Sequence, residues 1–180
     1  NKAYTHELFL QVLREHYMRL GIKAQVRRLF PGVARTVYEL TSEPLVSVII
    51  ANKDHRNDLE RCIESLEQDS DYKNLEILIV ENNSTSEEIF AYYEQVRKRY
   101  NNVKILNYDK EFNYADIQNH AAVRAKGEYL LLLNNDTWME RPDSIREMLG
   151  YCMREDVGIV GARLLYPDNT IQHAGVIVGL

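Results

Sequence analysis

The chain of 180 residues has only two cysteines, four prolines and one tryptophan, and it has no apolar run long enough to cross a membrane. Cys62 and Cys152 lie far apart without the spacing of a zinc site, so we expect buried free thiols on the apolar faces of helices. No secretory signal is visible at the start. These absences exclude a disulfide-stapled secreted domain. They favour a cytoplasmic location, with attachment of a longer protein to the inner face of the plasma membrane left open.

The charge balance argues against nucleic acid as a partner. The net charge is -5 at neutral pH, whereas bulk nucleic-acid binding is typical of strongly basic domains. Residues 1–43 hold seven Lys/Arg and four Glu, so this segment is mildly basic and the remainder is acidic. A solvated surface is the simpler explanation of the basic segment, and docking to a partner or a membrane surface is the alternative.

Both ends of the sequence suggest a piece of a longer protein. The chain begins with Asn1 rather than Met, and residues 176–180 are apolar with no helix or strand stop signal. We therefore expect that the piece ends inside a domain. Its length suits one domain preceded by a small appendage.

Residues 1–43 predict a helix followed by a β-hairpin. Apolar residues recur at helical spacing over residues 7–20, and Gly21 provides a stop. A Pro-Gly turn at residues 31–32 separates two expected strands, 23–29 and 33–40. The residues expected to face inward from the helix are Phe9, Val12, Leu13, Tyr17 and Leu20.

From residue 44 onward, apolar strands alternate with amphipathic helices. This alternation predicts an α/β fold with a mostly parallel sheet, helices on its faces and right-handed crossovers. The run at residues 129–133 is unbroken and is expected to be buried on both faces. The expected strands are 45–50, 75–80, 103–106, 129–133, 157–166 and 170–178, and the expected helices begin near residues 57, 86, 115 and 142.

Polar residues follow each of the first four of these strands, including Asn107 and Asp109 after the third. The carboxyl ends of parallel strands meet at one edge of a sheet, where open α/β folds bind their ligands. A polar turn explains each group taken alone, because Asn and Asp are favoured in turns. Together they predict a polar crevice formed by Ala51, Asn52, Lys53, Asp54, Glu81, Asn82, Asn134, Asn135 and Asp136.

This crevice lacks the glycine-rich turn of dinucleotide folds and the Gly-Lys-Ser/Thr of a phosphate loop. A bound diphosphate would need another positive partner, and Asp136 is the candidate ligand of such a divalent cation. Glu81 and Asn82 carry groups that suit the hydrogen-bonding edge of a nucleobase. Asn113 could adopt a left-handed conformation at the edge of the site, and Asn119 either faces the crevice or lies on the surface.

Three blocks resemble a known family in their order and spacing. They are PLVSVIIA at residues 44–51, EILIVENNS at 76–84 and AKGEYLLLLNND at 125–136. Over about residues 44–180 the chain resembles the family 2 glycosyltransferases of the GT-A fold. GIVG at 158–161 and QHAG at 172–175 resemble a bacterial subgroup that builds cell-envelope polysaccharides, including rhamnose-rich ones. A helix and hairpin often precede the domain in that subgroup, so we divide the chain into a lead-in at 1–43 and a truncated GT-A domain at 44–180.

The resemblance implies the inverting transfer of a sugar from a nucleoside diphosphate donor to a saccharide or lipid-linked acceptor, with UDP or dTDP favoured over GDP. It implies that Asp136, the last residue of the family's Asp-x-Asp motif, binds Mg²⁺ or Mn²⁺, which assists departure of the diphosphate. Other motif positions are matched by Asn134 and Asn135 near the ribose and sugar, Glu81 and Asn82 near the base, and Ala51, Asn52 and Lys53 in the first nucleotide loop.

Several residues depart from the family pattern. Ala51 stands where the family usually has proline, Lys53 where an aromatic residue often stacks on the base, and Asn134 where the motif has its first carboxylate. The family's catalytic base is a carboxylate well downstream of the motif, and no residue of this chain matches it. We therefore expect the chain alone to transfer no sugar. The alternatives are a sugar-1-phosphate nucleotidyltransferase-like enzyme and a non-catalytic module that binds a nucleotide sugar or a partner.

Overall fold

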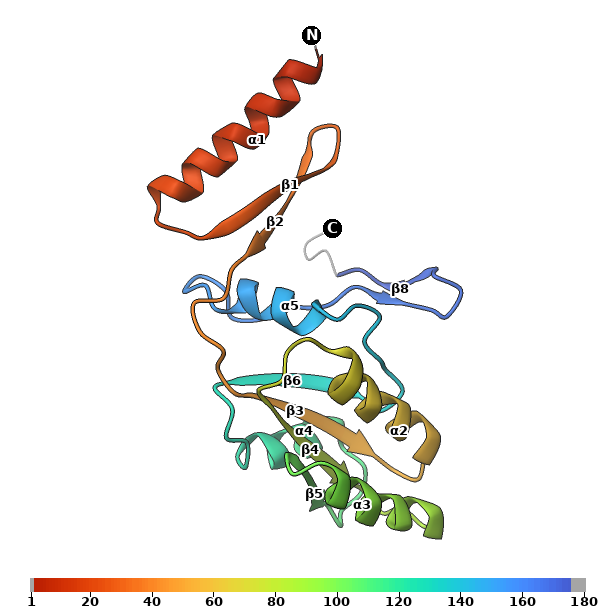
Figure 1. Ribbon diagram of the computed structural model, residues 1–180. Coiled ribbons are helices and arrows are strands. Elements are labelled where there is room, and N and C mark those ends of the chain that lie inside the picture. The colour runs from red at the N-terminus through yellow and green to blue at the C-terminus, as the bar shows by residue number, and fades with distance from the viewer. Residues whose placement is uncertain (1, 176–180) are drawn as a thin grey trace. The chain divides into compact units, whose positions relative to one another are not determined.

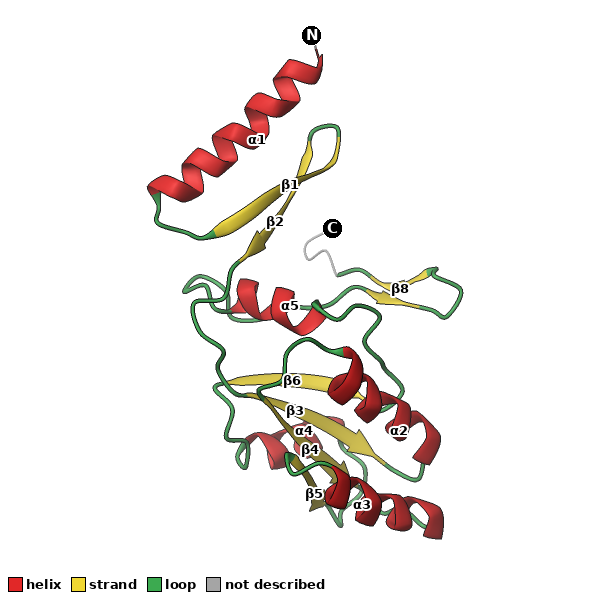
Figure 2. Cartoon of the chain, in the orientation of Figure 1, coloured by secondary structure: helices red, strands yellow, loops and turns green. Residues whose placement is uncertain are grey.

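The computed structural model describes residues 2–175 (Figure 1). The chain divides into two compact units. One is Ser42–Ser144, which we call the sheet unit; the other combines Asn1–Thr41 with Ile145–Leu180, and we call it the hairpin unit. Figure 2 shows that helices and strands alternate through the sheet unit, as the sequence predicts. None of the described helices is long and apolar enough to span a membrane.

A four-stranded parallel sheet forms the centre of the sheet unit, with strand order β5-β4-β3-β6. Its register aligns the polar strand ends, since Asn52 lies opposite Glu81 and Ala51 lies opposite Asn134. The predicted parallel α/β sheet is therefore confirmed. The strands are β3 (Val46–Asn52), β4 (Leu75–Glu81), β5 (Val103–Asn107) and β6 (Tyr129–Asn134).

Helices cover both faces of this sheet. Figure 1 shows α2 (Arg56–Glu64) and α3 (Glu87–Arg99) on one face and α4 (Tyr114–Ala122) on the other. Buried Ile117 of α4 packs in a cluster with Ile49 and Leu78 of the central strands. Because β3 and β4 are covered on both sides, nearly every residue of these strands is buried. A five-residue π-helix, η1 (Ser65–Asp69), follows α2 directly.

The prediction that residues 129–133 are buried on both faces is wrong. Leu130 is 47% exposed and Leu132 is 52% exposed, and both point to the face that carries α4. β6 is an edge strand of the described sheet, and α4 contacts β3 and β4 instead. The apolar run therefore specified a strand, but not what covers it.

Gly127 lies against the backbone of β3. The helix expected to begin near residue 115 ends at Ala122, so Gly127 does not cap it. A Cβ atom at Gly127 would lie 2.5 Å from the backbone nitrogen of Ser47 and 2.8 Å from the carbonyl oxygen of Leu45. A glycine is required here because two backbones approach closely.

The hairpin unit begins with the predicted helix and hairpin. α1 (Lys2–Arg19) precedes an antiparallel pair, β1 (Ala24–Phe30) and β2 (Val33–Tyr38). The inward face of α1 differs from the prediction, because Leu10 is buried whereas Phe9 and Val12 are 41% and 57% exposed. Later in the chain, β7 (Leu164–Leu165) and β8 (Ile171–His173) replace the two longer strands that were expected. Residues 176–178 of the second expected strand lie outside the described residues.

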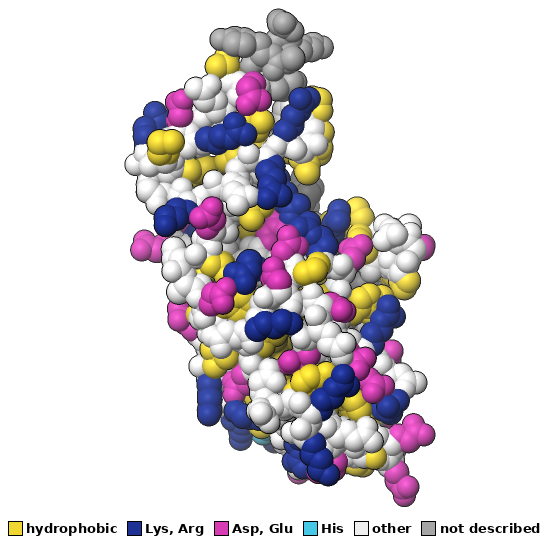
Figure 3. Space-filling view, in the orientation of Figure 1, with side chains coloured by type: hydrophobic (Ala, Val, Ile, Leu, Met, Phe, Trp, Pro, Cys, Tyr) yellow, Lys and Arg dark blue, Asp and Glu magenta, His cyan; other side chains and the backbone are white. Residues whose placement is uncertain are grey.

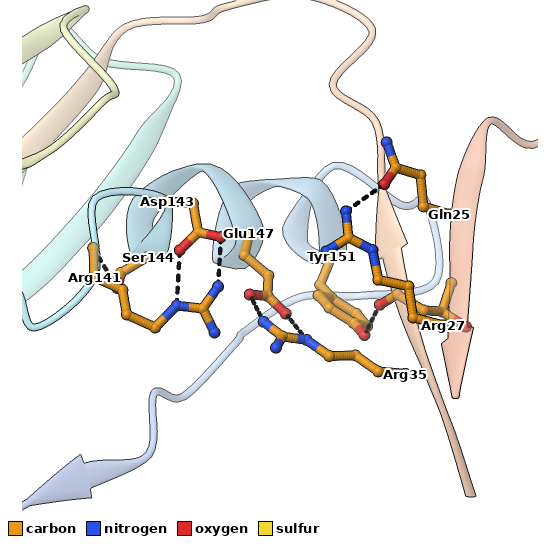
Figure 4. Close-up of polar contacts among 9 residues, drawn as sticks. Gln25, Arg27, Arg35, Arg141, Asp143, Ser144, Glu147 and Tyr151 are labelled. Carbon is orange, nitrogen blue, oxygen red and sulfur yellow. Dashed lines mark hydrogen bonds and ion pairs between the residues drawn. The ribbon is translucent and has the colours of Figure 1, made fainter. Parts of the chain in front are cut away.

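α5 (Ser144–Cys152) packs against β2 inside this unit (Figure 4). The Arg35 guanidinium forms a two-pronged ion pair with Glu147, in which Nε donates to Oε1 at 2.9 Å. The Tyr151 hydroxyl donates to the carbonyl of Thr36, and its ring meets that of Tyr38 edge-on at 4.9 Å between centroids. The lead-in hairpin is thus anchored to the helix that follows the crevice residues in sequence.

Candidate functional site

Three strand ends of the sheet unit are joined by a continuous chain of side-chain hydrogen bonds. The amide of Asn135, just after β6, donates to Oδ1 of Asn52 on β3 at 2.7 Å. Asn52 donates to the hydroxyl of Tyr93 at 2.8 Å, and Tyr93 donates to Glu81 on β4 at 2.5 Å. The structure therefore brings together the predicted residues Asn52, Glu81 and Asn135 around a tyrosine from α3.

Tyr93 was missed by the sequence reasoning. It was assigned to the apolar face of a helix, and it is indeed buried, but its hydroxyl lies between Asn52 and Glu81. Burial, together with the hydrogen bond to the Glu81 carboxylate, raises the pKa of Tyr93 above its ordinary value. The neutral phenol donates its hydrogen to Glu81 and accepts one from Asn52, so it fixes the end of β3 relative to the end of β4. The sequence offered one signal for this role, namely a tyrosine on the helix that follows the polar end of the second strand.

Glu81 and Asn82 are both buried and hold neighbouring loops. Glu81 accepts hydrogen bonds from the backbone nitrogen of Ser84 at 2.5 Å and from its hydroxyl at 2.6 Å. The amide of Asn82 donates to the carbonyl oxygens of Tyr108 at 3.0 Å and Lys110 at 2.9 Å. These side chains therefore fix the loops after β4 and β5.

Asp54 links the loop after β3 to the start of α3. Its Oδ1 atom accepts from the backbone nitrogens of Thr85 and Ser86 at 2.7 and 2.8 Å. These hydrogen bonds, of which that from Ser86 is the larger influence, hold the pKa of the Asp54 carboxyl below its ordinary value. Ser86 is the N-cap residue of α3 but makes no side-chain cap bond, and its own backbone nitrogen is held by a carboxylate from another loop.

Three predicted residues are exposed at this edge: Lys53, Asn134 and Asp136. Ala51 is half-buried within β3. Burial, and next the charge of Asp136, raise the pKa of the Cys62 thiol on α2 to about 12. Among the described residues, no group of three or more His, Cys, Asp or Glu side chains is placed to hold a metal ion. Any cation at Asp136 therefore takes its other ligands from amides, water or a bound molecule.

The residues near α4 differ from expectation. Asn113 is extended, with φ -143°, and caps α4 by accepting from the backbone nitrogen of Asp116 at 3.1 Å, so a left-handed conformation is wrong. A side-chain cap favours an extended backbone at that position. Asn119 is exposed on α4. The neighbouring Gln118, which sequence reasoning missed, is buried, and neither polar atom of its side chain has a hydrogen-bond partner in the structure.

Charge on the surface is mixed. Figure 3 shows acidic and basic side chains interspersed over the face in view, with apolar groups between them. An anionic ligand approaching this face meets no extended basic surface. Recognition of such a ligand must therefore rest on local groups.

Two solved structures have a similar fold, and one of them is a mannosyltransferase. A mannosyltransferase from Pyrobaculum calidifontis, in complex with GDP-Man and Mn²⁺, matches with a TM-score of 0.59 at 18% identity, over 65% of this chain and 34% of its own. Residues 1–349 of TarS from S. aureus match with a TM-score of 0.52 at 19% identity, over 59% and 32% of the two chains. These likenesses define the fold as GT-A.

Residues 47–175 match the family described as Glycosyl transferase family 2. The chain belongs to this family. An O-antigen biosynthesis protein, RfbC, from Myxococcus xanthus is 42% identical over 95% of the chain and 13% of its own length. The uncharacterized protein y4gI from Sinorhizobium fredii is 35% identical over 99% of the chain and 20% of its own length. The chain thus spans a fifth or less of these relatives.

Proposed function

We propose that this chain is the donor-binding part of a glycosyltransferase that extends a bacterial surface polysaccharide. The crevice at the carboxyl ends of β3, β4 and β6 binds a nucleoside diphosphate sugar together with a divalent cation. One observation carries this proposal: the exposed Asp136 carboxylate lies just beyond Asn135, whose amide is held by Asn52. The RfbC relative, described as an O-antigen biosynthesis protein, supports a polysaccharide as the product.

The donor set at Asp136 fits a weakly held Mg²⁺ or Mn²⁺. A single exposed carboxylate flanked by two amides leaves most coordination positions to water and to phosphate oxygens, as is usual for Mg²⁺ bound with a nucleotide. A bound cation would supply Lewis-acid stabilisation of the diphosphate as negative charge develops on it. The fold neighbour with GDP-Man and Mn²⁺ supports a metal-assisted reaction.

The remaining residues bind and orient the donor. Lys53 is exposed after β3 and provides a positive group near the strand ends. Glu81 acts through Tyr93 and Ser84, and the Asn82 amide is held by two loop carbonyls. We therefore assign both side chains a positioning role and leave direct base contact to the neighbouring loops. The unpartnered Gln118 amide supports a polar ligand on the α4 side. The inverting base is assigned to none of these residues.

Calorimetry tests this proposal directly. UDP, dTDP and GDP are titrated into the chain with and without Mn²⁺, and binding of at least one is expected only with the metal. Asp136→Asn preserves size and removes the charge, so it should abolish the metal-dependent heat. Asp168→Asn, in the exposed turn between β7 and β8, is the matched control and should bind as the unaltered chain does. Binding that ignores both Mn²⁺ and Asp136→Asn contradicts the proposal.

A further inference from the structure

An open pocket lies on the sheet unit beside α2, the helix that follows β3. It has a volume of about 320 Å³ and opens between α2, η1 and the loop after β6. That volume lies at the small end of the range for ligand sites, roughly 300–1,000 Å³. The side chains that matter here are Asn57, Arg61, Glu64, Gln68, Asp69 and Trp138.

The wall of this cavity is an irregular helix that is fixed to the Trp138 loop. Ser65, Gln68 and Asp69 belong to the π-helix η1, a rare conformation that occurs often at functional sites. The Ser65 hydroxyl donates to the carbonyl of Cys62 at 2.8 Å and accepts from the backbone nitrogen of Met139 at 3.2 Å. The residue after Trp138 is thereby tied to the helix.

Trp138 is the only tryptophan of the chain, and its ring has a defined orientation. The guanidinium carbon of Arg61 lies over the ring, 3.4 Å from its centroid. This cation–π contact attracts the charge to the face of the indole. The guanidinium therefore covers this face of the indole, and the stacked Arg61–Trp138 pair lies beside amide and carboxylate groups.

The chemistry of these groups fits a sugar ring better than other small ligands. A sugar has hydroxyl groups that both donate and accept, and the Arg61 guanidinium stacked on Trp138 can donate to them. Gln68 and Asn57 can pair with such hydroxyls in either sense, and Asp69 can accept from them. The Asp69 carboxylate disfavours a phosphate, whereas the Glu64 carboxylate is already paired with Arg99 at 3.0 Å. The polar walls disfavour a purely apolar molecule.

We propose that this cavity is a saccharide subsite that holds part of the acceptor glycan. Trp138 follows Asp136 by two residues, and the Cys62 thiol of α2 lies 3.7 Å from the Asn134 carbonyl at the end of β6. The subsite thus adjoins the strand end where the donor crevice lies. The assignment of the saccharide as acceptor rests on the proposed function, whereas the presence of a saccharide site at Trp138 does not.

The single tryptophan makes its fluorescence a local probe. The chain is titrated with methyl glycosides of rhamnose, mannose, galactose, glucose and N-acetylglucosamine in the absence of nucleotide. At least one should change the Trp138 emission in a saturable way. Gln68→Ala and Asn57→Ala should each weaken that binding by about three- to tenfold, because each removes a hydrogen-bonding amide. Gln95→Ala, at an exposed glutamine of α3, is the matched control and should have no effect.

Each result either supports or overturns a saccharide site at Trp138 or its assignment to the acceptor. No response to any glycoside, or a response that both cavity variants leave unchanged, overturns the proposal. A response that requires a sugar linked to UDP or GDP places the donor sugar here and overturns the acceptor assignment. A glycoside response that persists in Asp136→Asn, while UDP binding with Mn²⁺ is lost, supports both proposals. A glycoside response in a chain that binds no nucleotide at all retains the saccharide site and overturns the proposed function.

Discussion

The two units of the chain are built in opposite ways. The sheet unit is assembled from consecutive strands and helices, and its crevice residues follow those strands in order. The hairpin unit joins segments that are far apart, as in the ion pair between Arg35 and Glu147, which are separated by 112 positions. A pattern of alternating elements therefore predicts the first unit well, and it is silent on the pairings that hold the second together.

Truncation of the sheet core should have the largest effect on stability. Ile79 is fully buried in β4, so Ile79→Ala is expected to lower the free energy of unfolding by about 2–5 kcal/mol. Leu10→Ala, in the hairpin unit, should cost less, because many apolar neighbours on α1 are exposed. Urea unfolding followed by circular dichroism measures both changes. An equal or larger loss from Leu10→Ala would show that the hairpin unit has the better-packed core.

Two glycines provide a matched comparison between the units. A Cβ atom at Gly127 would clash with the β3 backbone, and one at Gly150 would lie 2.7 Å from the carbonyl oxygen of Tyr38. Each Gly→Ala change should destabilise its own unit by about 1–3 kcal/mol. Gly158→Ala is the control, since nothing lies within 4 Å of its added Cβ.

The reaction of the two free cysteines with a thiol reagent measures the local opening of each unit separately. Cys62 lies in the sheet unit and Cys152 on α5 of the hairpin unit. Burial raises the pKa of Cys62 to about 12, so its labelling by a thiol reagent requires local opening. Gly127→Ala should accelerate the labelling of Cys62, and Gly150→Ala that of Cys152. Acceleration of both thiols by either change would mean that the units open together.

The ion pair between β2 and α5 should contribute less to the free energy of unfolding than the buried residues and glycines above. Arg35→Ala, Glu147→Ala and the double variant form a thermodynamic cycle whose expected coupling is about 0.5–1 kcal/mol, because both side chains are partly exposed. Hydrogen exchange of the α5 amides measures this coupling. Additive effects of the two single changes would show that the pair does not stabilise the docking of the hairpin.

High pH should weaken the hairpin unit by a small amount. Burial, and next a hydrogen bond with Tyr17, raise the pKa of Tyr38 from 10.0 to about 12. The neutral phenol is favoured in the folded state, so its contribution is complete below the unfolded pKa and is lost as pH rises from about 10 to about 12. Tyr38→Phe should remove this part of the alkaline loss in urea unfolding. An unchanged alkaline profile in Tyr38→Phe would contradict the assignment.

Sequence patterns predicted that the polar strand ends meet, because strand direction alone brings them together. The register that sets Asn52 opposite Glu81 follows from two parallel strands of similar length. The position of the Tyr93 hydroxyl between them could not be predicted, because it depends on how α3 is rotated against the sheet. The same limit explains Asp54, whose partners at Thr85 and Ser86 belong to another loop.

Burial was harder to predict than element type. The apolar run ending at Leu133 specified a strand, yet whether Leu130 and Leu132 are covered depends on elements far away in sequence. On α1 a small rotation of the helix separates the predicted inward residue Phe9 from the observed Leu10, and both fit helical spacing. Neither the covering of β6 nor the rotation of α1 can be read from the residues of that strand or helix alone.

The location of the metal tests the central claim most directly. Mn²⁺ broadens the NMR signals of nearby nuclei, so the amides of an isotope-labelled chain report where it binds when UDP is present. We predict selective loss of signals from residues 134–136 and from the ends of β3 and β4, with no loss in Asp136→Asn. Broadening centred on other residues, or broadening that persists in Asp136→Asn, would contradict a metal-assisted nucleotide site at this crevice.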